Sequence, residues 1–105
     1  MTDSLNIIIG GVQGYVGREL LRLVLQHPYL HLTGILARKS QQELHQELPS
    51  IANLKIPVLA TEDMLKPNVV CDVLLLATPT ESSMEWVNLF KECSFKIIDL
   101  SGAFR

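Results

Sequence analysis

The sequence predicts an α/β fold in which helices cover both faces of a mostly parallel, doubly wound sheet. The chain has 105 residues, of which 48% are apolar and 19% are charged, and this suits one compact domain with a core. Apolar runs alternate along the chain with segments whose apolar residues recur at helical spacing. Glycine or proline lies at several of the boundaries between them. We therefore expect a single domain in which strands and helices alternate.

The first half of the chain predicts two strands and the helix between them. Residues 5–10 form an isoleucine-rich run that ends in two glycines, which is typical of a buried strand. A helix is expected over 15–26, ended by a proline, and residues 30–37 form the next strand. Residues 41–48 predict a short polar helix or turn, which the following proline closes. The apolar residues that we expect on the buried face of the first helix are Val16, Leu20, Leu21, Val24 and Leu25.

The second half of the chain predicts three more strands. They are expected at 56–59, 69–77 and 96–100, each an apolar run, and one helical turn is expected at 61–65. A longer helix is expected between the last two strands, up to about residue 93. Ser82 and Glu85 have the spacing of a capping box that would open this helix. The side chains that we expect it to present to the core are Trp86, Leu89 and Phe90.

Charge and composition exclude several classes of protein. The net charge is -2 and the isoelectric point about 5.8, whereas a nucleic-acid module normally carries a basic stripe. No apolar run approaches the roughly 20 residues that span a bilayer, and the first residues lack the pattern of a signal peptide. Cys71 and Cys93 lie far apart in the sequence and form neither a disulfide framework nor a zinc motif. We expect a cytoplasmic protein with no partner nucleic acid, no membrane contact and no metal site.

A glycine-rich segment between the first strand and the first helix is the strongest chemical signal. It reads Gly11-Val12-Gln13-Gly14-Tyr15-Val16-Gly17, and its spacing differs from the usual G-x-G-x-x-G fingerprint. Gly11 would permit a tight turn, Gly14 would let backbone amides approach a diphosphate, and Gly17 would let the helix pack on the strand. The segment predicts a dinucleotide site in a Rossmann-type fold; the alternative is that its glycines serve packing alone. The cofactor contacts expected here are Gly11, Gln13, Gly14, Tyr15 and Val16.

A basic segment follows the second strand, where sites that prefer NAD usually have an acidic residue. Here the sequence reads Ala37-Arg38-Lys39-Ser40. Arg38 is a planar donor suited to the 2′-phosphate of NADP, and Ser40 could add a hydroxyl contact. The segment therefore predicts NADP as the cofactor; the alternative is a pair of solvated charges.

The turn after the fourth strand is the third candidate. Thr78 and Pro79 lie in a run of small residues and proline, opposite the glycine-rich segment across the expected sheet. Such a turn would line the nicotinamide side of a cofactor pocket. The alternative is a strand that simply ends before a capped helix.

These motifs together resemble N-acetyl-γ-glutamyl-phosphate reductases. The resemblance rests on four stretches and is strongest in the last, Ile-Asp-Leu-Ser-Gly-Ala-Phe-Arg: residues 8–23, 37–40, 75–79 and 98–105. It implies an NADP-dependent enzyme of arginine biosynthesis that reduces an acyl phosphate to an aldehyde through a cysteine thioester, with a histidine as acid and base. Two departures from the family are Thr80, where many members have histidine, and Gly10, where relatives often have a larger apolar residue.

The resemblance also implies that residues 1–105 are only part of such an enzyme. The family's catalytic cysteine and histidine lie beyond the matching stretches, so we expect a truncated NADP-binding domain that binds cofactor without catalysis. No catalytic residue is assigned, while Arg105 is a candidate contact for the anionic substrate, N-acetyl-glutamyl phosphate. A homo-oligomer is expected. The alternatives are a stand-alone, non-catalytic dinucleotide-binding module and a fragment of an aspartate-semialdehyde dehydrogenase.

Overall fold

The computed structural model describes residues 4–100, apart from the side chain of Thr80. Within that range the strands form one parallel sheet in the order β3-β2-β1-β4-β5. The strands are β1 (Leu5–Gly10), β2 (Leu30–Leu36), β3 (Val58–Leu59), β4 (Val73–Leu76) and β5 (Lys96–Asp99). The helices are α1 (Tyr15–Gln26), α2 (Gln41–Glu47), α3 (Pro49–Ala52), α4 (Thr61–Met64) and α5 (Thr80–Phe90).

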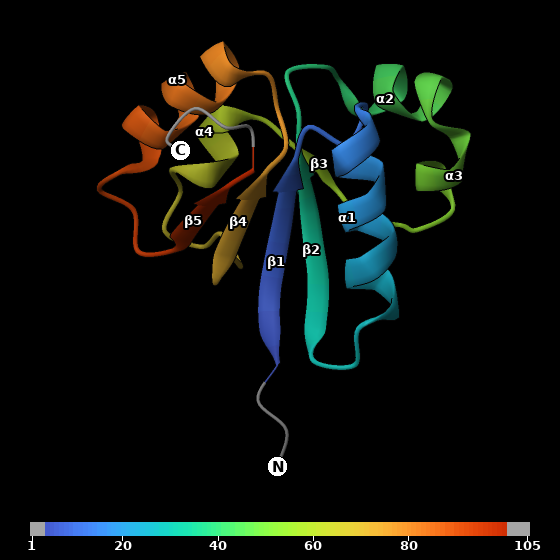
Figure 1. The fold of residues 1–105 in the computed structure, drawn as a ribbon, viewed down its shortest axis with the longest axis horizontal. Coiled ribbons are helices and arrows are strands. Elements are labelled where there is room, and N and C mark those ends of the chain that lie inside the picture. The colour runs from blue at the N-terminus through green and yellow to red at the C-terminus, as the bar shows by residue number, and fades with distance from the viewer. Residues whose placement is uncertain (1–3, 101–105) are drawn as a thin grey trace.

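The helices cover both faces of this sheet, as the sequence predicts. Figure 1 shows α1, α2 and α3 on one side of the strands and α4 and α5 on the other, with the strand arrows all pointing upward. Alternate residues of β1 face opposite ways, so Ile9 joins the cluster under the first three helices and Ile8 joins the cluster under the other two. The α/β, doubly wound, Rossmann-type prediction is confirmed.

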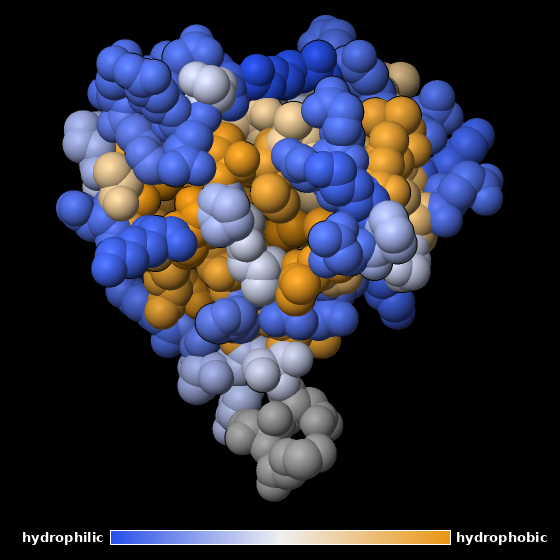
Figure 2. Space-filling view, turned by 180° about the vertical axis from the view of Figure 1, so that it is seen from behind, coloured by the Kyte–Doolittle hydropathy of each residue, from blue (hydrophilic) through white to orange (hydrophobic). Residues whose placement is uncertain are grey.

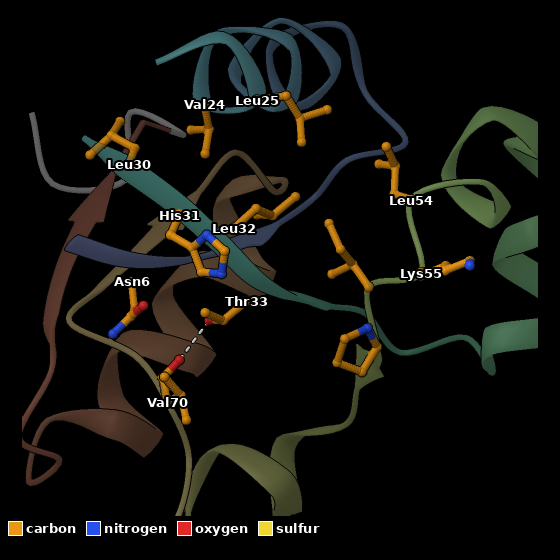
Figure 3. Close-up of a pocket in the computed structure, with 12 residues that line it drawn as sticks. Asn6, Val24, Leu25, Leu30, His31, Leu32, Thr33, Leu54, Lys55 and Val70 are labelled. Atoms are coloured by element: carbon orange, nitrogen blue, oxygen red, sulfur yellow. Dashed lines mark hydrogen bonds between the residues drawn. The ribbon is translucent and has the colours of Figure 1, made fainter. Parts of the chain in front are cut away.

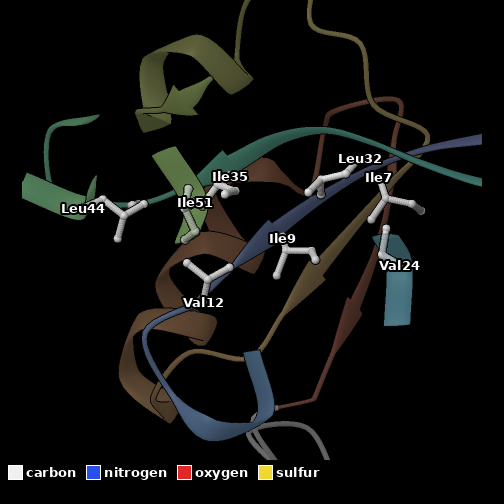
Figure 4. Close-up of a cluster of buried hydrophobic side chains, with 9 residues drawn as sticks. Ile7, Ile9, Val12, Val24, Leu32, Ile35, Leu44 and Ile51 are labelled. Atoms are coloured by element: carbon white, nitrogen blue, oxygen red, sulfur yellow. The ribbon is translucent and has the colours of Figure 1, made fainter. Parts of the chain in front are cut away.

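Two buried apolar clusters hold the layers together. The first surrounds β1 and β2 and is drawn in Figure 4: Ile7, Ile9, Val12, Val24, Leu32, Ile35, Ala37, Leu44 and Ile51. The second fills the opposite face: Ile8, Leu36, Met64, Leu74, Leu76, Trp86, Phe90 and Phe95. Full burial of one such aliphatic or aromatic side chain contributes roughly 1.5–3 kcal/mol. These clusters fix the sheet, and with it the positions of the loops at its carboxyl edge.

The fourth strand is shorter than the sequence predicts, because β4 begins at Val73 rather than at residue 69. The preceding residues pair with groups elsewhere in the chain. The Thr33 hydroxyl donates to the Val70 carbonyl at 2.6 Å, and the Asn6 N–H donates to the Asp72 carboxylate at 2.7 Å. The Asp72 N–H also donates to the Asn6 carbonyl at 2.8 Å, so the residues ahead of β4 are bonded to both β1 and β2.

Two expectations about α5 are wrong. Helix α5 begins at Thr80 with Pro79 as its N-cap, so the predicted capping box of Ser82 and Glu85 does not form. Leu89 is 45% exposed rather than in the core. Pro49 follows the end of α2, as predicted, and it also occupies the first turn of a further helix, α3.

The first helix forms where the sequence predicts it, but two of its apolar residues do not face the sheet. Val16 and Leu25 are 49% and 46% exposed, while Gly17 and Val24 are buried. The buried stripe is therefore narrower than the apolar pattern. Among the helices of residues 4–100, none is long and apolar enough to cross a bilayer.

Candidate functional site

The glycine-rich segment and the turn after β4 meet at the carboxyl edge of the sheet. Because β1 and β4 are parallel neighbours, their carboxyl ends lie together, and the Ala77 N–H donates to the Gly10 carbonyl at 2.9 Å. A cavity of about 600 Å³ lies between the two loops. Its lining residues are Gly11, Gln13, Gly14, Val16, Ala77, Thr78, Pro79 and Leu100. Six of the predicted contacts are thus brought together, at the edge where open α/β sheets bind their ligands.

Two glycines of this segment are required by the fold. Gly11 has φ 91°, and a Cβ there would lie 2.7 Å from the carbonyl carbon of Ala77. A Cβ on Gly17 would lie 1.9 Å from the Gly11 carbonyl oxygen. These positions admit no side chain, because real Cβ atoms do not approach other backbone so closely. Packing alone therefore accounts for Gly11 and Gly17.

Gly14 differs, because the fold does not need a glycine there. Its backbone is extended, and the nearest atom to a Cβ would be the Gly11 carbonyl oxygen at 3.9 Å. The space that this side chain would fill is open and borders the cavity. A glycine in such a place leaves room for another molecule to approach the backbone, as a dinucleotide-binding loop requires.

Helix α1 presents an uncapped N-terminus to the same cavity. Gly14 is the N-cap and makes no side-chain hydrogen bond, and the first turn contains no acidic residue. The first N–H groups of a helix lack intrahelical acceptors, and the helix dipole adds partial positive charge there. This end of α1 can accept a phosphate or another anion.

The turn after β4 is fixed by a contact that the sequence reading missed. Thr78 is 8% exposed and Ser83 is fully buried, and their hydroxyl oxygens lie 2.6 Å apart. This bond ties the loop to the first turns of α5, while Pro79 remains exposed at the cavity. The sequence signal that could have predicted this contact is the pair of hydroxyl residues, Thr78 before the start of α5 and Ser83 just after it.

Arg38 and Ser40 follow β2 and do not line this cavity. The Arg38 guanidinium forms an ion pair with Glu85 and lies 5.2 Å from the centre of the Trp86 ring. Ser40 is the N-cap of α2 and forms a capping box with Glu43, with both hydrogen bonds at 3.2 Å. Their predicted contact with a 2′-phosphate stays a prediction; in this structure both bind protein groups.

The remaining predicted contacts are placed as follows. Tyr15 begins α1, is 83% exposed and does not line the cavity. Arg105 lies outside the described residues, as does the side chain of Thr80.

Neither cysteine lies near the cavity. Cys71 precedes β4 and Cys93 precedes β5, so both are at the amino edge of the parallel sheet, opposite the glycine-rich segment. Burial, together with the negative charge of the Asp72 carboxylate, raises the pKa of the Cys71 thiol to about 11. Since the thiolate is the nucleophile, this environment disfavours the reactive form of Cys71. Within residues 4–100, no three His, Cys, Asp or Glu side chains gather as metal ligands would.

A larger cavity of about 700 Å³ lies at the beginning of β2, away from the glycine-rich segment (Figure 3). Leucine and valine side chains make up much of its wall, together with His31 and Thr33 of the strand. Its one dashed contact in Figure 3 is the bond from Thr33 to Val70. None of the predicted contacts lies there.

Comparisons with known proteins show which family this chain resembles. Residues 6–105 match the family model described as semialdehyde dehydrogenase, NAD binding domain. The N-acetyl-γ-glutamyl-phosphate reductase of Alteromonas mediterranea is 39% identical over 95% of this chain and 32% of its own length. The enzyme of the same name from Escherichia coli is 35% identical over 96% of this chain and 32% of its own.

A solved structure supports the fold. It is an aspartate semialdehyde dehydrogenase with NADP from Candida albicans, 17% identical, with a TM-score of 0.76 over 97% of this chain and 31% of that one. The chain thus spans about a third of the length of the curated relatives named above. The family model covers nearly the whole chain and begins within β1, just before the glycine-rich segment. The chain therefore belongs to the semialdehyde dehydrogenase family, and it corresponds to the NAD-binding domain of that family.

Proposed function

We propose that residues 1–105 form the NADP-binding domain of an N-acetyl-γ-glutamyl-phosphate reductase. The observation that carries this proposal is the open backbone at Gly14, which borders the cavity at the uncapped end of α1. The fold fixes Gly11 and Gly17, whereas no close contact requires glycine at position 14, where a bound ligand would. The names of the relatives supply the reaction, reduction of an acyl phosphate, and the family resemblance implies an aldehyde as the product.

Different residues of the cavity would bind different parts of the cofactor. The amide groups of the first turn of α1 would hold the diphosphate, which Gly14 lets approach closely. Thr78 and Pro79 would border the nicotinamide, since they lie across the cavity from the glycine-rich segment. The cofactor would supply a hydride; the residues of this domain bind and orient it.

The choice of NADP over NAD rests on Arg38. Its guanidinium is about half exposed, and no acidic residue follows β2 before α2 to bind ribose hydroxyls. A charge-assisted contact between guanidinium and phosphate would favour the 2′-phosphorylated cofactor. Arg38 would have to exchange Glu85 for this phosphate.

The groups that break and form bonds would lie outside residues 1–105. Acyl transfer needs a nucleophile and proton transfer needs an acid–base group. The positions of Cys71 and Cys93 at the far edge of the sheet support placing the nucleophile elsewhere, and so does the raised pKa of Cys71. The substrate, N-acetyl-glutamyl phosphate, would be bound mainly by those other parts.

We also propose that the protein associates with itself. Large apolar side chains are exposed on several elements, among them Leu23, Val70 and Ile98. Hydrophobic surface occupies the middle of the face seen in Figure 2, and hydrophilic side chains surround it. Such surface favours association. Light scattering should show dimers or larger species at high concentration; a monomer at millimolar concentration would contradict this.

The proposed function is tested by binding and turnover in parallel. Calorimetry with NADP should show binding to the wild-type chain, and a phosphate-dependent assay with N-acetylglutamate semialdehyde should show no NADPH formation. Absence of NADP binding by a folded chain would refute the proposal. NADPH formation that disappears in Cys71→Ser or Cys93→Ser would show that one of these thiols is the nucleophile.

A further inference from the structure

Trp86 of α5 packs against Gly10 at the end of β1 and lies beneath Arg38, which follows β2. Its ring is 3% exposed, and a Cβ on Gly10 would lie 3.0 Å from the ring atom Cζ3. Gly10 therefore leaves the space that the indole occupies. The indole Nε1–H is buried and has no acceptor within the described part of the chain. Packing rather than hydrogen bonding positions the ring.

Arg38 lies over this ring. Its guanidinium carbon is 5.2 Å from the ring centre, within the range of a cation–π contact. The ring of α5 thus provides a fixed platform for a side chain that comes from the end of β2. The remaining N–H groups of the guanidinium can bind oxygen atoms in its plane.

Glu85 occupies some of those N–H groups. It precedes Trp86 in α5, and its carboxylate forms an ion pair with Arg38. Both side chains are more than half exposed, so the pair contributes little to folding. It has another consequence, because a carboxylate and a phosphate compete for the same guanidinium donors. A bound 2′-phosphate would also lie near the negative charge of Glu85 unless that side chain turned away.

We propose that Glu85 is a specificity-determining residue of the dinucleotide site, acting as a counter-ion that a 2′-phosphate must displace from Arg38. This inference rests on the proposed function. Glu85 holds the guanidinium over Trp86 and lowers the preference for NADP over NAD. NAD has no 2′-phosphate and does not enter this exchange.

The test measures the affinity of four chains for NADP and NAD: wild type, Glu85→Gln, Arg38→Ala and the double variant. Glu85→Gln should bind NADP about two- to fivefold more tightly, as expected for the loss of one exposed competing ion pair. NAD affinity should stay unchanged within about twofold. The gain should disappear in the Arg38→Ala background, because the competition acts only through that guanidinium. Glu92→Gln is the matched control, since it removes the same charge from the exposed segment after α5.

Fragments of the cofactor with and without the 2′-phosphate show the contribution of this group to binding. Adenosine 2′,5′-bisphosphate should show the same gain on Glu85→Gln, and AMP should show none. Unchanged or weaker NADP binding by Glu85→Gln would overturn the inference, and so would an equal gain for NAD or for Glu92→Gln. If the wild type binds neither cofactor, the proposed function fails and this inference fails with it. If Gly14→Val abolishes NADP binding while Glu85→Gln leaves it unchanged, only the role of Glu85 is wrong.

Discussion

The glycine-rich segment, residues 11–17, and the basic segment, residues 37–40, both follow a strand of the same sheet. They differ in whether their polar groups already have side-chain partners. In the glycine-rich segment the helix end has no side-chain cap, and Gly14 borders open space. In the basic segment each polar side chain is bonded to a glutamate. The three pairs are Arg38–Glu85, Lys39–Glu47 and Ser40–Glu43.

Because of this difference, we expect the glycine-rich segment to determine the affinity for the cofactor and the basic segment to determine the preference for NADP or NAD. The N–H groups at the N-terminus of α1 can donate to an anion without displacing a side-chain cap. The glycine-rich segment can therefore supply most of the binding free energy. Arg38 must exchange one partner for another, and its net contribution is the difference between the two interactions. Substitutions in the first segment should therefore have large effects, and substitutions in the second should mainly change which cofactor is preferred.

The largest effect is expected for Gly17→Ala. A methyl group 1.9 Å from the Gly11 carbonyl oxygen forces the helix away from the strand. The cost should be at least about 3 kcal/mol of unfolding free energy, more than the roughly 1 kcal/mol that alanine gains over glycine in a helix. Urea denaturation measures this. Gly14→Ala is the control and should lose no more than about 1 kcal/mol, since alanine is a poorer N-cap than glycine. Equal losses in both variants would contradict the distinction between these glycines.

Gly14→Val should separate binding from folding. Its extended backbone accepts a branched residue, although valine is a poorer N-cap than glycine, so stability should fall by no more than about 1 kcal/mol. The side chain would occupy the open space beside the amides of α1, and NADP affinity should fall at least about a hundredfold. Calorimetry and thermal unfolding of the same sample measure both. Undiminished affinity in the folded variant would show that this loop does not hold the cofactor.

Arg38→Ala should weaken the binding of NADP but not that of NAD. A charge-assisted contact with the 2′-phosphate is worth about 1.5–3 kcal/mol, and loss of the ion pair with Glu85 offsets up to about 1 kcal/mol of it, so NADP affinity should fall roughly three- to a hundredfold. NAD affinity should remain within about twofold, because NAD lacks the phosphate. Titrations of both cofactors decide this. Equal affinities of the wild type for NADP and NAD would contradict the role of Arg38.

The smallest effect concerns the cap of α2. Hydrogen bonds from the backbone N–H and the hydroxyl of Ser40 lower the pKa of the Glu43 carboxyl below its ordinary value of 4.5. A depressed folded-state pKa gives stability that is complete above the unfolded-state pKa and is lost as the pH falls through the folded-state value. Wild type should lose more stability than Glu43→Gln between about pH 5 and pH 3. Parallel denaturation curves across this range would mean that the capping box contributes nothing.

The sequence predicts the local parts of the fold well. The first strand and first helix are found at the expected residues, since a short isoleucine run and a helical apolar pattern decide them locally. The start of β4 could not be predicted, because Thr33 and Asn6, which bond to the segment before it, are distant in sequence.

Two identical sequence patterns near the candidate site show that spacing alone does not predict which side chains will pair. Ser40 and Glu43 have the spacing of a capping box, and so do Ser82 and Glu85, but only the first pair forms one. Pro79 fixes an earlier start for α5, and Arg38, brought close by the sheet, pairs with Glu85 instead. The glycine-rich segment needed no such information, because its strand, turn and helix are consecutive.

The close fit of Gly10 and Trp86 couples these two positions. A larger residue at position 10 would meet the indole ring at 3.0 Å, and a smaller residue at position 86 would leave a void beside the end of β1. Each change alone is unfavourable, while a paired exchange keeps the volume. Among related proteins the two positions should therefore vary together, and a chain with a bulky residue at position 10 needs another platform for its arginine.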